Sequence, residues 1–184
     1  NHGYQYSSHT IDIAILYQTL MTSGNGYDYQ RGWRREETDN NIPMVELLQD
    51  RITIPKETAF VLEGFGQDSD EDNQMTFSWE QNDASETSFW PPDFPPDTGP
   101  LFCSVDGDAD GNKRFFPTME SLLTNEYFTS YLEKLPFASR EINMRLLVRD
   151  NDLYSGGFNY KNVQLIVDEN AGPFRVTSQS NPEN

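Results

Sequence analysis

The chain has 184 residues, with 13 Lys and Arg against 30 Asp and Glu, and a formal net charge of −17. So large an excess of negative charge repels nucleic acids and anionic membrane surfaces, and neither is an expected partner. No stretch approaches the roughly 20 apolar residues of a membrane-spanning helix, so membrane insertion is not expected. Hydrophobic residues are 35% of the chain and aromatic residues 13%, and these aromatic side chains can fill the core of one domain.

The N-terminal part of the chain predicts a helix. Residues 8–21 place Ile11, Ile15 and Leu16 on one helical face, which predicts a helix of roughly three turns. We expect residues 1–24 to be this helical segment and residues 25–42 to be a linker. The chain begins at Asn1 without a signal peptide or an initiator Met, and we expect it to be a processed piece of a longer protein.

Residues 43–169 predict an antiparallel β-sandwich, and residues 170–184 a linker or the start of a following domain. The segment 44–54 begins the sheet, and short stretches of alternating apolar residues follow it. The apolar residues expected on one face of each strand are Phe60 and Leu62; Met75, Phe77 and Trp79; Ile142, Met144, Leu146 and Val148; and Val163, Leu165 and Val167. We expect Trp79 at the centre of the core.

Three other segments connect or flank the predicted strands. Residues 116–123 have Pro117 near a helix start and apolar residues at helical spacing, which predicts a short crossover helix. Four prolines within residues 91–96 exclude both helix and central strand there. The only cysteine, Cys103, lies in a predicted strand over residues 101–105 and is expected to be a small buried residue.

An acidic loop is the strongest chemical signal. Asp106, Asp108 and Asp110 alternate before Gly111, and carboxylates spaced in this way suit Ca²⁺. The EF-hand pattern is incomplete, because the position for its bidentate acid is Pro117. The alternative is a solvated acidic turn.

Two further acidic groups extend the calcium hypothesis. Asp68, Asp70 and Asp72 lie in a turn between two predicted strands, and Asp150 and Asp152 follow a long strand. The two groups lie at the same end of the sandwich if those strands run in opposite directions. The alternative is that these side chains accept hydrogen bonds from their own backbone turns.

No catalytic constellation is found in the sequence. His2 and His9 are the only histidines, and neither has a second metal ligand at a usable spacing, so no zinc site is expected. Cys103 has no nearby histidine that would activate it as a nucleophile. We expect no enzymatic activity from this chain alone.

A series of short motifs resembles a known family. In order, they are N-N-I-P at 40–43, I-P-K-E-T-A-F-V-L-E-G at 54–64, D-S-D-E-D at 68–72, M-T-F-S-W-E-Q at 75–81, G-P-L-F at 99–102, F-P-T-M-E-S-L-L at 116–123, L-P-F-A-S-R-E-I-N-M-R-L-L-V-R-D-N at 135–151 and A-G-P-F-R-V-T-S at 171–178. This order resembles the segment that follows the catalytic domain in secreted bacterial reprolysin-like zinc metalloproteases of Bacteroidetes type, which a secretion system sorts.

The resemblance implies an immunoglobulin-like, non-catalytic accessory module, and it implies that residues 1–24 are the end of a preceding protease domain. The expected partners are neighbouring domains of the same polypeptide or a cell-surface protein, and the expected location is secreted or on the bacterial cell surface. The parent protein would be the zinc metalloprotease. One alternative is a calcium-rigidified adhesion or filament module. Another is a carbohydrate-binding sandwich that uses Trp33, Trp90 and Tyr residues as a stacking platform.

Overall fold

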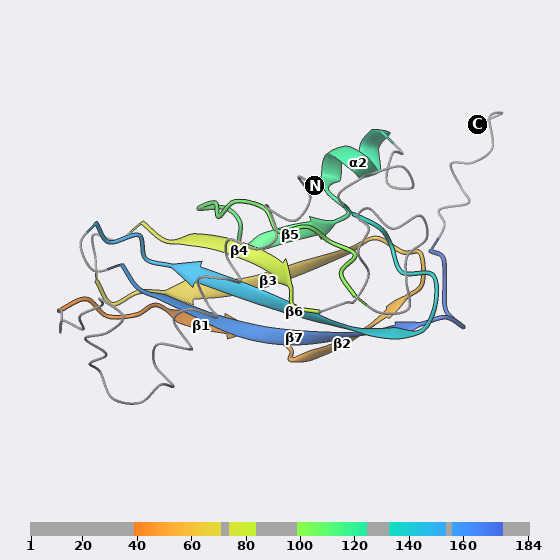
Figure 1. Cartoon of the computed structure of the whole chain (residues 1–184), viewed down its shortest axis with the longest axis horizontal. Helices are drawn as coiled ribbons and strands as arrows, with labels where there is room; N and C mark the ends of the chain where they lie inside the picture. Colours follow the sequence, from red (N-terminus) through yellow and green to blue (C-terminus); the bar gives the residue numbers. More distant parts are fainter. Residues whose placement is uncertain (1–38, 71–73, 84–98, 125–132, 154–155, 175–184) are drawn as a thin grey trace, which may run out of the picture.

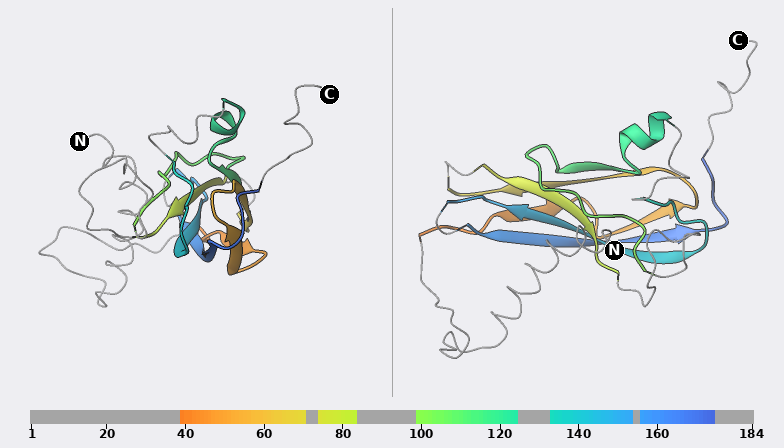
Figure 2. Two further views of the ribbon diagram at one scale, coloured as in Figure 1. Left: turned by 90° about the vertical axis from the view of Figure 1, so that its right-hand side faces the viewer. Right: turned by 45° about the horizontal axis from the view of Figure 1, so that its top comes forward.

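The computed structural model describes residues 39–70, 74–83, 99–124, 133–153 and 156–174. This part of the chain is mainly β, and its strands form two sheets (Figure 1). Figure 2 shows the same two layers from the end and from a tilted direction. Each sheet has one apolar face, and both are buried when the faces pack together.

The smaller sheet has three strands in the order β1-β3-β5. They are β1 (Met44–Leu47), β3 (Phe60–Gln67) and β5 (Lys113–Phe116), and both pairings are antiparallel. The sequence did not predict β5, because residues 113–116 carry charged and aromatic residues on both faces. Strand β1 forms one edge of this sheet and β5 the other.

The larger sheet has four strands in the order β2-β7-β6-β4. They are β2 (Arg51–Pro55), β7 (Phe158–Asp168), β6 (Arg140–Arg149) and β4 (Thr76–Gln81). Strands β6 and β7 form a long antiparallel hairpin, which pairs Arg140 with Val167 and Arg149 with Phe158. Strand β4 is antiparallel to β6 on the other side of that strand.

The prediction of a purely antiparallel sandwich is wrong at β2. This strand pairs with β7 in parallel, with Arg51 beside Gln164 and Ile54 beside Val167. The segment 44–54, which was expected to begin the sheet, contains two strands, because the chain leaves the smaller sheet after Leu47 and joins the larger one at Arg51. The chain keeps its direction when it passes from β1 to β2, but its neighbouring strand changes from β3 to β7. Because β7 runs in the same direction as β2, this pairing is parallel.

The predicted core is confirmed. Trp79 is 1% exposed and belongs to the buried cluster, and its Nε1–H donates to the carbonyl of Asn112 at 3.1 Å. The predicted inward residues of the hairpin are also buried: Ile142, Met144, Leu146 and Val148 on β6, and Val163, Leu165 and Val167 on β7. The alternating apolar residues were predicted correctly, because successive side chains of a strand point to opposite faces and these residues share the face that packs on the core.

The predicted short helix exists as α2 (Met119–Thr124) between β5 and β6. It begins three residues later than predicted, because Thr118 caps it. The Thr118 hydroxyl oxygen accepts a hydrogen bond from the backbone N–H of Ser121 at 3.3 Å, as an N-cap residue does. Pro117 therefore precedes the cap and is not the first helical residue.

The predicted strand over residues 101–105 is wrong. Within this segment only Phe102 makes a β-bridge, to Glu133. The side chain of Gln81 holds the segment against β4, because its Oε1 accepts from the N–H of Leu101 at 2.6 Å and of Phe102 at 3.0 Å. The segment thus packs beside β4 without forming a strand, and Cys103 is buried as expected.

Several predictions fall on residues outside the described part of the chain. These are the helix over residues 8–21, with the rest of the 1–24 segment and the linker up to residue 38; the proline loop at 91–96; both histidines; Trp33 and Trp90; Asp72; and residues 175–184. They stay predictions.

Candidate functional site

The described residues of the three predicted acidic groups lie toward one end of the sandwich, on the left in Figure 1. Arg149, at the end of β6, pairs with Thr76 at the start of β4, and Asp108 bridges to Phe77 beside it. Asn40 and Asn41 join the other two turns, because Asn40 donates to Asp150 and Asn41 donates to Asp70. The structure therefore brings the 68–70, 106–110 and 150–152 groups to the same end.

Asp150 closes the loop between β6 and β7. Its side chain is fully buried. Its Oδ1 accepts from the N–H of Asp152 at 3.1 Å, both oxygens lie 2.8 Å from the N–H of Gly157, and Oδ2 also accepts from Asn40 Nδ2 at 2.8 Å. A buried carboxylate is stabilised when several N–H groups donate to it. These donors make Asp150 a structural residue of the loop, while Asp152 contributes its backbone N–H.

Asp70 and Asp68 hold the turn after β3. The Asp70 carboxylate accepts from the backbone N–H of Asn41 at 2.7 Å and from its Nδ2 at 2.9 Å. Asp68 Oδ1 accepts from the N–H of Asp70 at 2.9 Å, a side-chain turn of the kind that aspartate favours. Asp68 Oδ2 is buried and receives no hydrogen bond within the described residues.

The 106–110 loop is attached to β4 by its backbone. The N–H of Phe77 donates to the carbonyl of Asp108 at 2.9 Å, and the N–H of Asp108 returns a bond at 3.1 Å. The Asp108 carboxylate accepts from the N–H of Asp110 at 2.8 Å. The Asp106, Asp108 and Asp110 side chains are exposed. The loop has the geometry of an acidic turn that forms hydrogen bonds with its own backbone.

Within the described residues, no group of three or more His, Cys, Asp or Glu side chains could hold a metal ion. The acidic turns share an end of the molecule, but the carboxylates of Asp68, Asp70, Asp108 and Asp150 accept hydrogen bonds from separate N–H groups. Calcium binding by Asp106, Asp108 and Asp110, or by the other two groups, stays a prediction. The hydrogen bonds favour the turn-forming role that the sequence offered as its alternative.

A buried ion pair closes the edge of the sandwich between β4 and β5, and the sequence did not predict it. Arg114 Nη2 donates to Glu133 Oε1 at 2.6 Å, and the two side chains are 9% and 3% exposed. The same guanidinium donates to the carbonyls of Trp79 at 2.6 Å and Cys103 at 2.7 Å. Glu133 Oε2 accepts from the N–H of Thr118 at 2.6 Å. Together these bonds join β5, β4 and three connecting segments.

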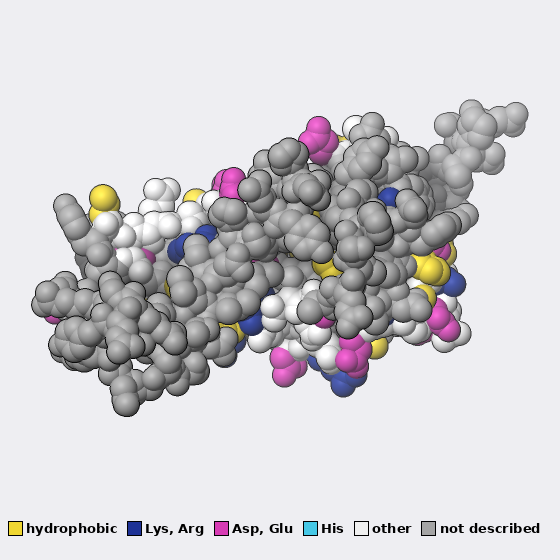
Figure 3. Space-filling model, viewed as in Figure 1, with side chains coloured by type: hydrophobic (Ala, Val, Ile, Leu, Met, Phe, Trp, Pro, Cys, Tyr) yellow, Lys and Arg dark blue, Asp and Glu magenta, His cyan; other side chains and the backbone are white. Residues whose placement is uncertain are grey.

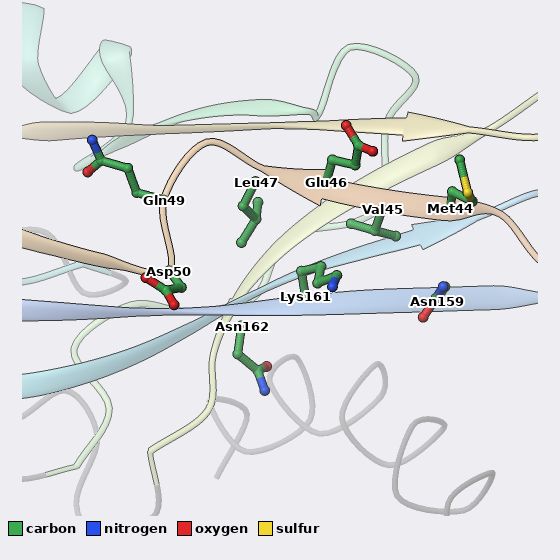
Figure 4. A pocket seen from close by; sticks show the side chains of 9 residues that line it. All are labelled: Met44, Val45, Glu46, Leu47, Gln49, Asp50, Asn159, Lys161 and Asn162. Atoms are coloured by element: carbon green, nitrogen blue, oxygen red, sulfur yellow. The ribbon is translucent and has the colours of Figure 1, made fainter.

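The opposite edge of the sandwich contains an open groove between β1 and β7 (Figure 4). Its volume is about 530 Å³, and it is lined by Met44, Val45, Glu46, Leu47, Gln49, Asp50, Asn159, Lys161 and Asn162. The turn from β1 into β2 closes one end of the groove, which is why Gln49 and Asp50 line it. Its size lies within the usual range for ligand-binding clefts.

The groove is lined by the edges of two strands. Strand β1 is an edge strand, and β2 covers β7 only from Gln164 to Asp168. Residues 158–163 of β7 therefore pair with β6 on one side and with no described strand on the other. The sequence did not predict this groove, because no local pattern in residues 44–54 shows that the chain changes sheets there.

The charged side chains on the face in Figure 3 are of both signs, with acidic and basic groups side by side along its lower rim.

No helix in the described part of the chain combines the length and the hydropathy needed to cross a bilayer. Comparisons with family models, with curated proteins and with solved structures find no match.

Proposed function

We propose that this chain is a non-catalytic, immunoglobulin-like module of a secreted or cell-surface metalloprotease-like protein, where it spaces and docks neighbouring domains. The proposal combines the resemblance in the sequence motifs with the geometry of the two sheets. Each part has separate support.

The order of the strands supports the immunoglobulin-like assignment. In immunoglobulin-like sandwiches, strands A, B, E and D share one sheet, and strands C, F and G share the other. With β1 and β2 counted as one divided strand A, β1-β3-β5 follows the order A-B-E and β7-β6-β4 follows the order G-F-C. No counterpart of strand D lies within the described residues. Trp79 lies on β4, the third strand, where antibody domains carry a buried tryptophan. The chain lacks the disulfide of those domains, since it has a single cysteine.

The main support for a spacing role is that the chain enters the sandwich at one end of its long axis and leaves it at the other end. Pro43, just before β1, accepts a hydrogen bond from Asn159 near the start of β7. The chain leaves the sandwich after Asp168 at the end of β7, and Figure 1 shows these points at opposite ends. The ten residue steps between Phe158 and Asp168 correspond to about 33 Å of extended strand. A module of this shape separates the domains before and after it.

The alternative is a calcium-rigidified module. The location of the acidic turns supports it, because all three lie at the end of the sandwich where β1 begins. The hydrogen bonds of their carboxylates to N–H groups favour a turn-forming role instead of calcium binding. The carbohydrate-binding alternative depends on Trp33 and Trp90, which lie outside the described residues.

The assignment of this chain to a metalloprotease-like protein is tested by sequencing the reading frame that encodes the chain. We expect it to extend upstream into a domain with an H-E-x-x-H zinc motif. A frame with no such domain would overturn the assignment. For the docking role, the upstream domain and this chain are expressed separately and mixed in a calorimeter. Measurable binding supports docking, and no binding at high concentration contradicts it.

A further inference from the structure

The groove between β1 and β7 contains backbone groups that a β-strand could use. Gln164 donates its N–H to the carbonyl of Asp50 at 2.9 Å, which shows that this N–H points away from β6 and toward β2. Backbone direction alternates along a strand, so the N–H and carbonyl groups of Asn162 and Tyr160 point the same way. Strand β2 ends before it reaches them, because its first pair is Arg51 with Gln164. The backbone groups of Asn162 and the carbonyl of Tyr160 therefore face the groove.

At one position on the free edge of β7, the side-chain amide of Asn159 makes the hydrogen bonds that a peptide group of a neighbouring strand would make. Its Oδ1 accepts from the N–H of Tyr160 at 2.9 Å, and its Nδ2 donates to the carbonyl of Pro43 at 2.9 Å. One amide thus joins the edge of β7 to the chain that leads into β1. Further along the groove, beside Asn162, no described side chain plays this part.

The charge of the groove indicates the kind of segment that suits it. Two carboxylates, Glu46 and Asp50, stand at its rim, and Lys161 is the single cation among the lining residues. Glu46, Asp50 and Lys161 are exposed, and the whole chain carries −17. A second copy of this chain would bring the same negative charge to the groove, whereas a basic segment would be attracted to it. Leu47, which is half-buried, offers apolar contact along one wall.

We propose that this groove binds an extended, positively charged segment of a partner polypeptide as an added β-strand along residues 159–163 of β7. Main-chain hydrogen bonds to Tyr160 and Asn162 would supply affinity, and Glu46 and Asp50 would select for Lys or Arg. Strand edges attract such segments because their backbone groups have no partner within the sheet. The inference rests on the proposed docking function and names its surface.

The experiment uses the full chain and a synthetic probe, acetyl-Lys-Val-Lys-Val-Thr-Val-Lys-amide. A matched peptide with the same side chains but with its valine N–H groups methylated cannot donate the main-chain bonds. We expect the first peptide to bind and to shift the amide NMR signals of Tyr160 and Asn162. We expect the methylated peptide to bind at least about tenfold more weakly, because it keeps the charge but loses the pairing.

Charge reversal at the rim tests the selection for basic segments. In the double variant Glu46→Lys and Asp50→Lys, both changed side chains are exposed, so we expect it to fold and to bind the probe about tenfold more weakly. Asp106→Lys with Asp110→Lys makes the same change in net charge away from the groove, and we expect an effect within about twofold. Equal weakening by both double variants would overturn the inference.

Three other outcomes would overturn it as well. One is a failure of the probe to bind. Another is binding only after residues 1–38 are removed, which would make the chain's own N-terminal segment the occupant. The third is a dimer in sedimentation that the rim variant dissociates, which would make a second copy the occupant. If the probe fails while the upstream domain still binds, this inference is wrong and the proposed function stands.

Discussion

Arg114 places a full positive charge inside the edge of the sandwich, and its acceptors come from separate segments of the chain. One is the Glu133 carboxylate, and the others are the carbonyls of Trp79 and Cys103. The guanidinium also lies 4.6 Å from the centre of the Phe116 ring. A charge in such a place is tolerated only while its partners remain, so Arg114 fixes how these segments meet.

Removing the negative partner is therefore expected to be costly. Glu133→Gln leaves the Arg114 charge buried without its counterion, and we expect the free energy of unfolding to fall by about 3 kcal/mol in urea titrations. Glu63→Gln is the matched control, because its ion pair with Lys113 is 3.6 Å long and 46% and 42% exposed. We expect this control to cost less than about 1 kcal/mol. Equal losses in the two variants would contradict a structural role for the buried pair.

At the scale of the elements, the loop before β5 is joined to β4 by close backbone packing. A Cβ atom built on Gly111 would lie 2.4 Å from the carbonyl oxygen of Phe77 and 3.0 Å from that of Asp108. The N–H of Gly111 also donates to the Asp108 carbonyl at 3.1 Å. A side chain at residue 111 would push the loop away from the edge of β4.

Gly111→Ala should therefore separate the loop from the strand. We expect it to lower the free energy of unfolding by about 1–3 kcal/mol and to speed hydrogen exchange at the Phe77 amide. Gly107→Ala in the same loop is the control, since its nearest neighbours are side-chain atoms of Thr76 and Arg149 at 3.3 and 3.4 Å. We expect this control to stay within about 0.5 kcal/mol of the parent chain. A silent Gly111→Ala would show that the loop moves freely.

The strands that were predicted well are those with one face on the core. In β6 the apolar residues alternate from Ile142 to Val148, and in β7 they alternate from Val163 to Val167. This period predicts both strands and their buried faces. Strand β5 has no such pattern, because Arg114 shares the inner face with Phe116. The charge of Arg114 is compensated by Glu133, 19 residues later, and no local pattern signals this contact.

The change of sheet between β1 and β2 lies beyond local prediction for a related reason. Residues 44–54 form an extended stretch whose two halves pair with strands far apart in the chain. Met44 pairs with Gln67, while Arg51 pairs with Gln164. The choice of partner depends on where β7 lies, and β7 comes more than 100 residues later. The groove beside β7 follows from this change, so the candidate site could not be predicted either.

At the scale of the whole molecule, the aspartates of the acidic turns have two different roles. Some, such as Asp68, Asp70 and Asp150, hold N–H groups at the end of the sandwich. Others, such as Asp106 and Asp110, are exposed and add to a net charge of −17. Like charges on one small protein repel each other and favour the expanded, unfolded chain. Salt screens this repulsion over about 10 Å at 0.1 M.

The stability of the chain should therefore rise with salt of any kind. Between about 50 mM and about 500 mM NaCl we expect the melting midpoint to rise by several degrees, because screening removes repulsion that folding concentrates. At constant ionic strength, about 1 mM CaCl₂ and excess EDTA should give midpoints within about 1 °C of each other, because no group of three or more acidic side chains in the described part of the chain converges on one point. A calcium-specific rise, lost in Asp106→Asn with Asp108→Asn but kept in Asp68→Asn, would contradict this view of the 106–110 loop. It would favour the calcium-rigidified module over a sandwich that its own hydrogen bonds hold together.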